Sequence, residues 1–259
     1  MTEVGAADQT RLRDYLALAV FVVSTSMLGA VATELLPGVV VAGYAALFLP
    51  WLGVCLERRR FSIWHLVAAA VLARLVLVWC DPMLSDDIFR YIWDGRVSAA
   101  GINPFVHPPA SDALAGLRDT AIWPNVNHPE VPTIYPPVAQ YFFWLVGAVG
   151  GGATVIKLGL VIVEALAVGA FGWYFGRRRG DWNVVRNLIV VYALNPLVMV
   201  EVAWSGHVDV LAWWPMIGAL VVWQRSEATT GALAAGGLLG ASIGAKFLGL
   251  VALPLMLFS

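Results

Sequence analysis

The sequence predicts an all-α fold: a polytopic transmembrane helical bundle with a large external loop that carries short amphipathic helices. Three observations lead to this class. Of the 259 residues, 60% are hydrophobic and only 13% are charged, whereas about a quarter of a soluble domain is charged. Several apolar runs have the length of a membrane span. Tryptophans gather at the ends of these runs, as interfacial anchors do. Nothing in the net charge of −1 suggests nucleic acid as a partner.

Residues 1–61 are predicted to form an N-terminal transmembrane hairpin. Its first apolar run, Tyr15–Leu36, has the length of a full span and lacks an obvious cleavage site, so we expect an uncleaved helix. The second run, Val39–Leu56, ends at the basic cluster Glu57–Arg60. Positive residues stay on the cytoplasmic side of a membrane. This places the cluster and the N-terminus in the cytoplasm.

The next run, Ile63–Cys80, is predicted to cross outward, which makes the loop 81–150 external. Tyr135–Val149 is apolar, but about 16 helical residues reach only roughly 24 Å, short of a ~30 Å hydrocarbon core. If this run also crossed, Arg177–Arg179 at the end of the following span, Thr154–Phe175, would lie outside. We therefore expect Tyr135–Val149 to be a juxtamembrane or re-entrant helix on the outer side.

The remaining chain is predicted to cross three more times and to begin a further span. These segments are Val184–Ala203 with a break at Asn195-Pro196, Val210–Trp223, Gly231–Ala245 and the partial run Leu248–Phe258. The total is seven full spans and a partial eighth. Residues 62–259 would thus form one transmembrane module, and because the chain stops inside an apolar run we expect its C-terminus to be truncated.

The most polar stretch is Ser85–Arg96, with three carboxylates and two arginines in twelve residues. As a helix that begins near Ser85, it places Asp87, Arg90, Tyr91 and Asp94 on one face, because they are spaced i, i+3, i+4 and i+7. Ser85 is a suitable N-cap. The pattern predicts a short amphipathic helix at a membrane surface. The alternative is a well-capped loop helix whose charges are only solvated.

Carboxylates beside a bilayer can act as a general base, as metal ligands or as acceptors for sugar hydroxyls. Here the residues also carry a resemblance. Ser85–Arg96, Gly101–Phe105 and Asn127–Pro137 resemble the GT-C superfamily of integral membrane glycosyltransferases, nearest its bacterial mannosyltransferase-like group that uses polyprenyl-phosphate sugars. Asn195-Pro196, Glu201–Asp209 and the Gly-rich helix that ends at Lys246 are similar to later segments of that group.

The resemblance implies an inverting transfer of a hexose, mannose by family, from a polyprenyl-phosphate donor to a hydroxyl of a glycolipid or polysaccharide. It places the reaction at the outer face of the cytoplasmic membrane. Asp86 or Asp87 would be the general base. We favour Asp86, because the family's acidic pair leads with its first carboxylate, while Asp87 remains the alternative because it shares a face with Tyr91 and Asp94. The predicted substrate-binding residues are Arg90, Tyr91, Asp94, Arg96, Asn127, His128, Tyr135, His207, Asp209 and Lys246.

Arg90, Arg96 and Lys246 are the candidates for neutralising the phosphate. No cofactor is expected, the alternative being a divalent metal held by Asp86, Asp87, His207 and Asp209. Two other functions compete with the enzyme: a transporter or flippase of polyprenyl-linked glycans, and a non-catalytic assembly subunit. A transporter should carry its polar groups near the membrane midplane. In this sequence they gather in one loop, which favours the enzyme.

Overall fold

The computed structural model describes residues 3–58, 60–82, 84–225 and 228–258, and over these residues it is helical without any β-strand. The predicted all-α class is therefore confirmed. The chain divides into two compact units. The first comprises Met1–Met83 and Ala165–Ser205, and the second comprises Leu84–Glu164 and Gly206–Ser259. The predicted division at residue 61 is a different boundary and stays a prediction.

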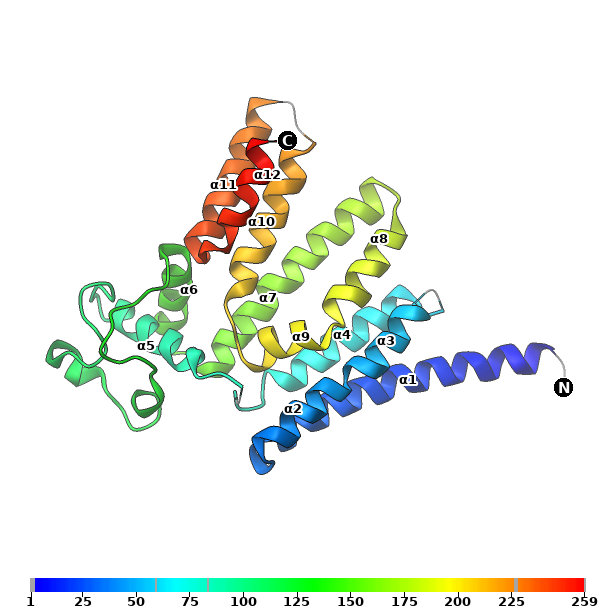
Figure 1. Ribbon diagram of the computed structural model, residues 1–259, viewed down its shortest axis with the longest axis horizontal. Helices are drawn as coiled ribbons and strands as arrows, with labels where there is room; N and C mark the ends of the chain where they lie inside the picture. Colours follow the sequence, from blue (N-terminus) through cyan, green and yellow to red (C-terminus); the bar gives the residue numbers. More distant parts are fainter. Residues whose placement is uncertain (1–2, 59, 83, 226–227, 259) are drawn as a thin grey trace. The chain divides into compact units, whose positions relative to one another are not determined.

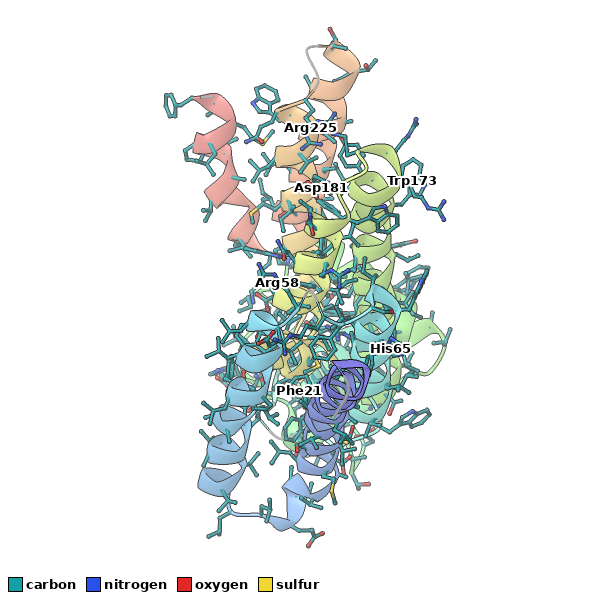
Figure 2. All side chains as sticks on the ribbon, turned by 90° about the vertical axis from the view of Figure 1, so that its right-hand side faces the viewer. Phe21, Arg58, His65, Trp173, Asp181 and Arg225 are labelled. Atoms are coloured by element: carbon teal, nitrogen blue, oxygen red, sulfur yellow. The ribbon has the colours of Figure 1, made fainter. Side chains whose placement is uncertain are left out.

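The first unit begins with the predicted hairpin (blue in Figure 1). Its segments are α1 (Glu3–Val31), a 3-10 turn (Ala32–Glu34), α2 (Pro37–Ala46) and α3 (Phe48–Leu56). Pro37 starts α2 at a position where the missing N–H costs no hydrogen bond. Helix α1 packs against α4 (Ile63–Leu77) so closely that a Cβ on Gly29 would lie 2.7 Å from Leu77 Cδ2. Phe21 of α1 is fully buried (Figure 2).

The rest of the first unit is the end of α7 (Ala153–Gly172) and the segments after it. These are a π-helical turn (Trp173–Arg178), α8 (Trp182–Asn187), a second such turn (Leu188–Ala193), α9 (Pro196–Met199) and a third (Val200–Trp204). The predicted break at Asn195-Pro196 is confirmed, since the two helical halves are bent by 61°. Arg74 of α4 donates to the freed Ala193 carbonyl at 2.6 Å. An arginine inside an apolar helix thus satisfies backbone that the break exposes.

The predicted basic cluster after α3 is tied to α8. Arg58, labelled in Figure 2, donates from Nε to Asn187 Oδ1 at 2.8 Å. Arg186 donates from Nη1 to the carbonyl oxygens of Arg58 and Phe61. The chain reversal between α3 and α4 is therefore held by two arginines. Arg59 of the predicted cluster lies outside the described residues.

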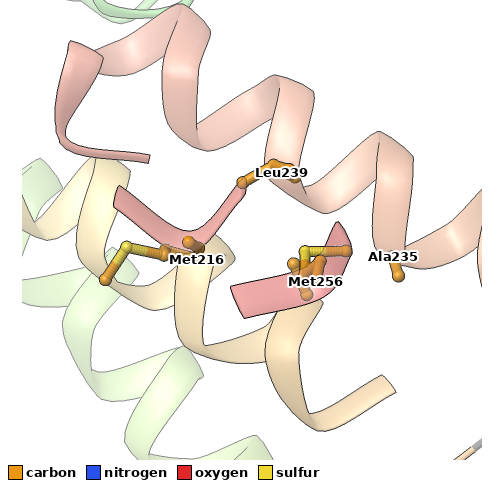
Figure 3. Packing of buried hydrophobic residues seen from close by; sticks show 6 residues of the cluster. Met216, Ala235, Leu239 and Met256 are labelled. Carbon is orange, nitrogen blue, oxygen red and sulfur yellow. The ribbon is translucent and has the colours of Figure 1, made fainter. Parts of the chain in front are cut away.

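The second unit contains the acidic stretch and the last apolar helices. Its segments, besides the start of α7, are α5 (Asp87–Ala99), 3-10 turns at Asp112–Leu117 and Trp123–Asn125, α6 (Pro137–Ala148), α10 (Asp209–Trp223), α11 (Thr229–Ala245), a 3-10 turn at Phe247–Val251 and α12 (Ala252–Leu257). Helices α10, α11 and α12 pack side by side (Figure 1). Their shared core includes Met216, Ala235, Leu239 and Met256 (Figure 3).

The predicted count of seven full spans stays a prediction, of which the helix lengths support only a part. Among the described residues, three apolar helices are long enough to cross a membrane, or four if the bent pair counts as one span. The long ones are Tyr15–Glu34, Pro37–Leu56 and Ala153–Arg178. Three other predicted spans are apolar helices of only 15, 15 and 17 residues, namely α4, α10 and α11. Helices α10 and α11 have nearly the predicted bounds, whereas α4 ends at Leu77, before the end of the predicted run at Cys80.

Helix α6 has 12 residues and reaches roughly 18 Å at 1.5 Å per residue. The prediction that Tyr135–Val149 is too short for a full span is therefore confirmed. Pro136 precedes the helix and Pro137 occupies its first turn. Because proline has no N–H to donate, the pair fixes where α6 begins. This start is what places Tyr135 next to α5.

Candidate functional site

The acidic pair lies where α5 begins. The helix starts at Asp87 with Asp86 in the N-cap position, so the predicted N-cap Ser85 is wrong by one residue. Ser85 Oγ instead accepts the Asp87 N–H at 3.2 Å, which closes a turn ahead of the helix. The Asp86 side chain does not cap its own helix. Its carboxylate is therefore available to other groups.

One side-chain amide bridges the two carboxylates. Asn127 Nδ2 donates to Asp87 Oδ1 at 2.8 Å and to Asp86 Oδ1 at 3.1 Å. Asp86 is exposed, while Asp87 is 37% exposed and more enclosed. The Tyr91 hydroxyl lies 3.5 Å from Asp87 Oδ2, and His207 Nε2 lies 3.9 Å from the same oxygen. Five of the predicted site residues thus meet at one point.

The polar face of α5 is covered by protein. Arg90 and Asp94 form an ion pair of 3.0 Å between Nε and Oδ1, with side chains only 5% and 2% exposed. Gln140 of α6 donates to Asp94 Oδ2 at 3.0 Å. Burial raises the pKa of Asp94, against the opposing effect of the Arg90 charge and the hydrogen bonds. The spacing argument for one shared face is confirmed, and the alternative of charges that are only solvated is wrong for Arg90 and Asp94; the location at a membrane surface stays a prediction.

Arg90 also holds the backbone of the segment 127–131. Its Nη1 donates to the carbonyls of Asn127 at 3.4 Å and His128 at 3.2 Å, and Nη2 donates to Val131 at 2.8 Å. His128 has φ of +44°, a left-handed conformation that non-glycine residues seldom adopt. Its side chain points outward and is 79% exposed. Arg90 therefore bonds to groups within the protein, whereas the His128 ring lies at the surface.

Aromatic rings form the wall behind Asp87. Tyr91 stacks on Phe143 of α6, with ring centroids 4.8 Å apart, and meets the edge of Tyr135 at 5.0 Å. Burial raises the pKa of Tyr91, and the neighbouring Tyr135 and Asp87 raise it further. Burial also raises the pKa of Tyr135, to about 12. Both phenols are therefore hydrogen-bond donors at neutral pH.

Arg96 belongs to a different cluster. It lies nine residues after Asp87, which is roughly 13 Å along the helix axis. Its guanidinium pairs with Asp119 at 2.8 Å and donates to the Leu117 carbonyl at 3.0 Å. The structure does not bring Arg96 to the acidic pair, so its predicted role at the phosphate has no support in the geometry.

Asp119 organises the loop that follows. Partial burial raises the pKa of this carboxyl, but N–H donation from Trp123 and Ile122 and the Arg96 charge outweigh it and lower the pKa to about 2. A carboxyl with a lowered pKa stabilises the fold fully above its unfolded value, near 4, and loses that effect as the pH falls through about 2.

We therefore expect residues 117–125 to open between pH 4 and pH 2. Hydrogen exchange of this segment in detergent, measured across that range, checks it. The Asp119→Asn variant should exchange fast at every pH. Asp112→Asn, which removes an exposed carboxylate of the same loop, should behave as wild type. If the protection of residues 117–125 from exchange in wild type is the same at pH 4 and pH 2, the prediction fails.

The later turn contributes a second ion pair near the start of α10. Lys246 Nζ lies 2.6 Å from Asp209 Oδ1, and both side chains are about half exposed. The turn before α10 packs closely against α5 and α7. Its Gly206 has φ of +75°. A Cβ at this position would lie 2.7 Å from Ile88 Cδ1 and 3.1 Å from Lys157 Cγ. Glycine is required at this close approach. It keeps His207 beside Asp87.

The predicted alternative of a divalent metal has no assembled site. Among the residues that the structure describes, no three His, Cys, Asp or Glu side chains are grouped so that they could hold a metal ion. Asp86, Asp87 and His207 are near neighbours, but Asp209 pairs with Lys246 instead. The expectation of no cofactor and the metal alternative both stay predictions.

Comparison with known proteins decides the family. A family model described as "Alpha-(1->6)-mannopyranosyltransferase, N-terminal domain" matches residues 4–259. The chain belongs to this family. The resemblance to membrane mannosyltransferases is thereby confirmed, and the protein is a glycosyltransferase. Searches of curated proteins and of solved structures each found no match.

Within this member of the family, sequence reasoning missed several residues of the site. Gln140 and Thr133 complete the buried network around Asp94, since Gln140 Nε2 also donates to Thr133 Oγ1 at 2.7 Å. A glutamine within an apolar helix is the signal that could have found this network. Lys157, only 1% exposed, lies beneath Gly206. A lysine inside the apolar run of α7 is the corresponding signal there.

Proposed function

We propose that the protein transfers a mannosyl residue from a polyprenyl-phosphate donor to an acceptor hydroxyl, with inversion at the anomeric carbon and with an aspartate as general base. The single observation that supports this most is the acidic pair at the start of α5, whose two carboxylates share one amide donor and face aromatic and histidine side chains. The family match supplies the sugar and the type of bond.

The reaction balances with the groups present. The acceptor O–H gives its proton to the carboxylate while its oxygen attacks the anomeric carbon from the face opposite the phosphate. The bond between the anomeric carbon and the phosphate oxygen breaks, and its electron pair leaves with polyprenyl phosphate. An inverting enzyme that makes an α-linkage consumes a β-linked donor. The (1→6) bond of the family's description makes a primary 6-hydroxyl of the glycolipid or polysaccharide the acceptor.

Asp86 is our preferred base. It is exposed and accepts one hydrogen bond from Asn127, so it keeps lone pairs for the acceptor proton. Asp87 is the alternative, but it is surrounded by Asn127, Tyr91 and His207. These neighbours leave less room for an acceptor hydroxyl at Asp87 than at the exposed Asp86.

Lys246 is our preferred cation for the leaving phosphate. Arg90 is buried against Asp94 and three carbonyls, and Arg96 is paired with Asp119. Lys246 is about half exposed and can leave Asp209 at low cost, because exposed ion pairs contribute at most about 1 kcal/mol. A phosphate that meets this ammonium gains charge neutralisation as the bond breaks.

The reaction is proposed to occur at the outer face of the cytoplasmic membrane, with the N-terminus in the cytoplasm. The support is charge asymmetry: Arg58 and Arg60 follow α3 and Arg177–Arg179 follow α7, and such clusters stay inside. The segment between α4 and α7, which carries the acidic pair, then lies outside.

The test uses purified full-length protein in liposomes with a β-linked polyprenyl-phosphate [¹⁴C]mannose and a mannosyl glycolipid acceptor. We expect labelled product that an α-mannosidase removes and that linkage analysis assigns as (1→6). GDP-mannose without lipid donor is the matched control and should give no product. Transfer from GDP-mannose alone would overturn the donor class, and a β-linked product would overturn inversion from this donor.

A further inference from the structure

The amide of Asn127 uses both of its donors on the acidic pair. A primary amide has two N–H groups on one nitrogen, and here one points at Asp87 Oδ1 and one at Asp86 Oδ1, at 2.8 Å and 3.1 Å. Hydrogen bonds to a charged acceptor are stronger than neutral ones. Two neighbouring negative charges repel each other, and a shared donor offsets that repulsion. The two oxygens are therefore held around one nitrogen.

The backbone that carries Asn127 is held by the same helix that carries the acidic pair. Arg90 of α5 donates to Asp94 and to the carbonyls of residues 127, 128 and 131. The guanidinium is a rigid planar fork, so its contacts fix direction as well as distance. Since its side chain is 5% exposed, these contacts do not compete with water.

The turn at His128 completes the arrangement. A left-handed residue that is not glycine persists when surrounding contacts hold it. Arg90 donates hydrogen bonds to the carbonyls of Asn127, His128 and Val131. It therefore holds the backbone before and after the left-handed residue His128. The turn directs the Asn127 side chain back to the first residues of α5. Arg90, the turn and Asn127 thus link the middle of α5 to its own N-terminus.

We propose that Asn127 is a positioning residue for mannosyl transfer. It holds the carboxylates of Asp86 and Asp87 in one fixed arrangement for the acceptor hydroxyl, and the buried Arg90–Asp94 pair sets the position of Asn127. This rests on the proposed function and deepens it. The sequence predicted Asn127, Arg90 and Asp94 as substrate-binding residues. In this proposal they instead act through the acidic pair.

Two variants test the amide itself in the liposome assay. Asn127→Ala removes the side chain, and Asn127→Asp keeps its shape but removes both donors. A catalytic group displaced by about 1 Å can cost 10²-fold, so we expect kcat to fall between about 10-fold and 100-fold in both. The KM values for donor and acceptor should stay within about 2-fold, because no substrate contact is lost. Asn125→Ala is the matched control: Asn125 is exposed and donates to the Ala121 carbonyl at 2.9 Å. It should match wild type.

A double-mutant cycle separates positioning from substrate contact. If Asn127 acts through the base, its removal from the Asp86→Asn or Asp87→Asn variant, whichever has lost the base, should cost less than about 3-fold. An equal loss in the wild-type and both aspartate backgrounds would overturn the proposal. So would a rise in KM at constant kcat, which would make Asn127 a substrate contact.

A measurement without turnover keeps the two proposals distinguishable. Amide hydrogen exchange of the first turn of α5 should be faster in Asn127→Ala than in Asn125→Ala, because the tie between residue 127 and the helix start is lost. If wild type transfers no mannose, the proposed function fails, and this comparison still decides the positioning role. Equal exchange in the two variants would then overturn it.

Discussion

Mannosyl transfer by the Asp86→Asn variant is expected to be about 10²-fold to 10⁴-fold slower than wild type, because a positioned base contributes about that much. The asparagine keeps the shape of the side chain but cannot take the acceptor proton. Asp87→Asn should lose less, about 10-fold, since this residue only helps to orient its neighbour through Asn127. Single-turnover rates at saturating donor measure both variants without interference from product release.

Glu130→Gln is the control for this comparison. Glu130 is an exposed carboxylate on the neighbouring segment, 68% exposed and 4.0 Å from His128. Its variant should turn over as wild type does. A larger loss in Asp87→Asn than in Asp86→Asn would assign the base to Asp87. Wild-type rates in both would remove the acidic pair from the chemistry while leaving the family membership intact.

The second large effect concerns stability, where Gly95 of α5 meets Gly147 of α6. A Cβ on Gly95 would overlap the Phe143 carbonyl, and one on Gly147 would overlap the Gly95 carbonyl. Small residues let two helix backbones approach this closely. Neither obstacle is a flexible side chain, so the helices must separate. We expect Gly95→Ala or Gly147→Ala to destabilise the second unit by about 3 kcal/mol or more, at the upper end for overpacking.

Thermal unfolding in detergent compares these variants with a matched glycine. Gly237 lies within α11 of the same unit, and a Cβ there meets nothing within 4 Å. Gly237→Ala should be neutral or stabilising, since alanine favours a helix by about 1 kcal/mol over glycine. If all three variants melt at the same temperature, the two helices do not touch at their glycines.

Much of this architecture could be predicted from the sequence, because it depends on local pattern. The helical class, the bend at Asn195-Pro196 and the shortness of Tyr135–Val149 all follow from apolar length and proline chemistry. The shared face of Arg90 and Asp94 follows from spacing in the same way. The number of spans does not follow from apolarity alone, because α4, α10 and α11 are apolar but have only 15 to 17 residues, fewer than the roughly 20 of a typical span.

What covers the polar face of α5 could not be predicted either. Spacing shows that residues share a face, but it does not show what lies against that face. Arg90 binds backbone carbonyls 37 to 41 residues away, and a carbonyl leaves no mark in the sequence. The Arg96–Asp119 pair joins residues 23 positions apart and has no periodic signal either. The sequence therefore makes Arg90 and Arg96 look available for a phosphate, although both are paired within the protein.

Arg90 holds segment 127–131 in a way that lets the side chains of this segment vary. The arginine contacts only main-chain oxygens there, which every residue type provides. The side chains of His128, Glu130 and Val131 project from this segment, and the path of its backbone does not depend on their identity. Residues 130 and 131 can therefore be exchanged, and residue 128 also within the types that tolerate its left-handed turn. Such changes leave the placement of the acidic pair intact. The backbone path of segment 127–131 and the side chains that it presents can thus be engineered independently.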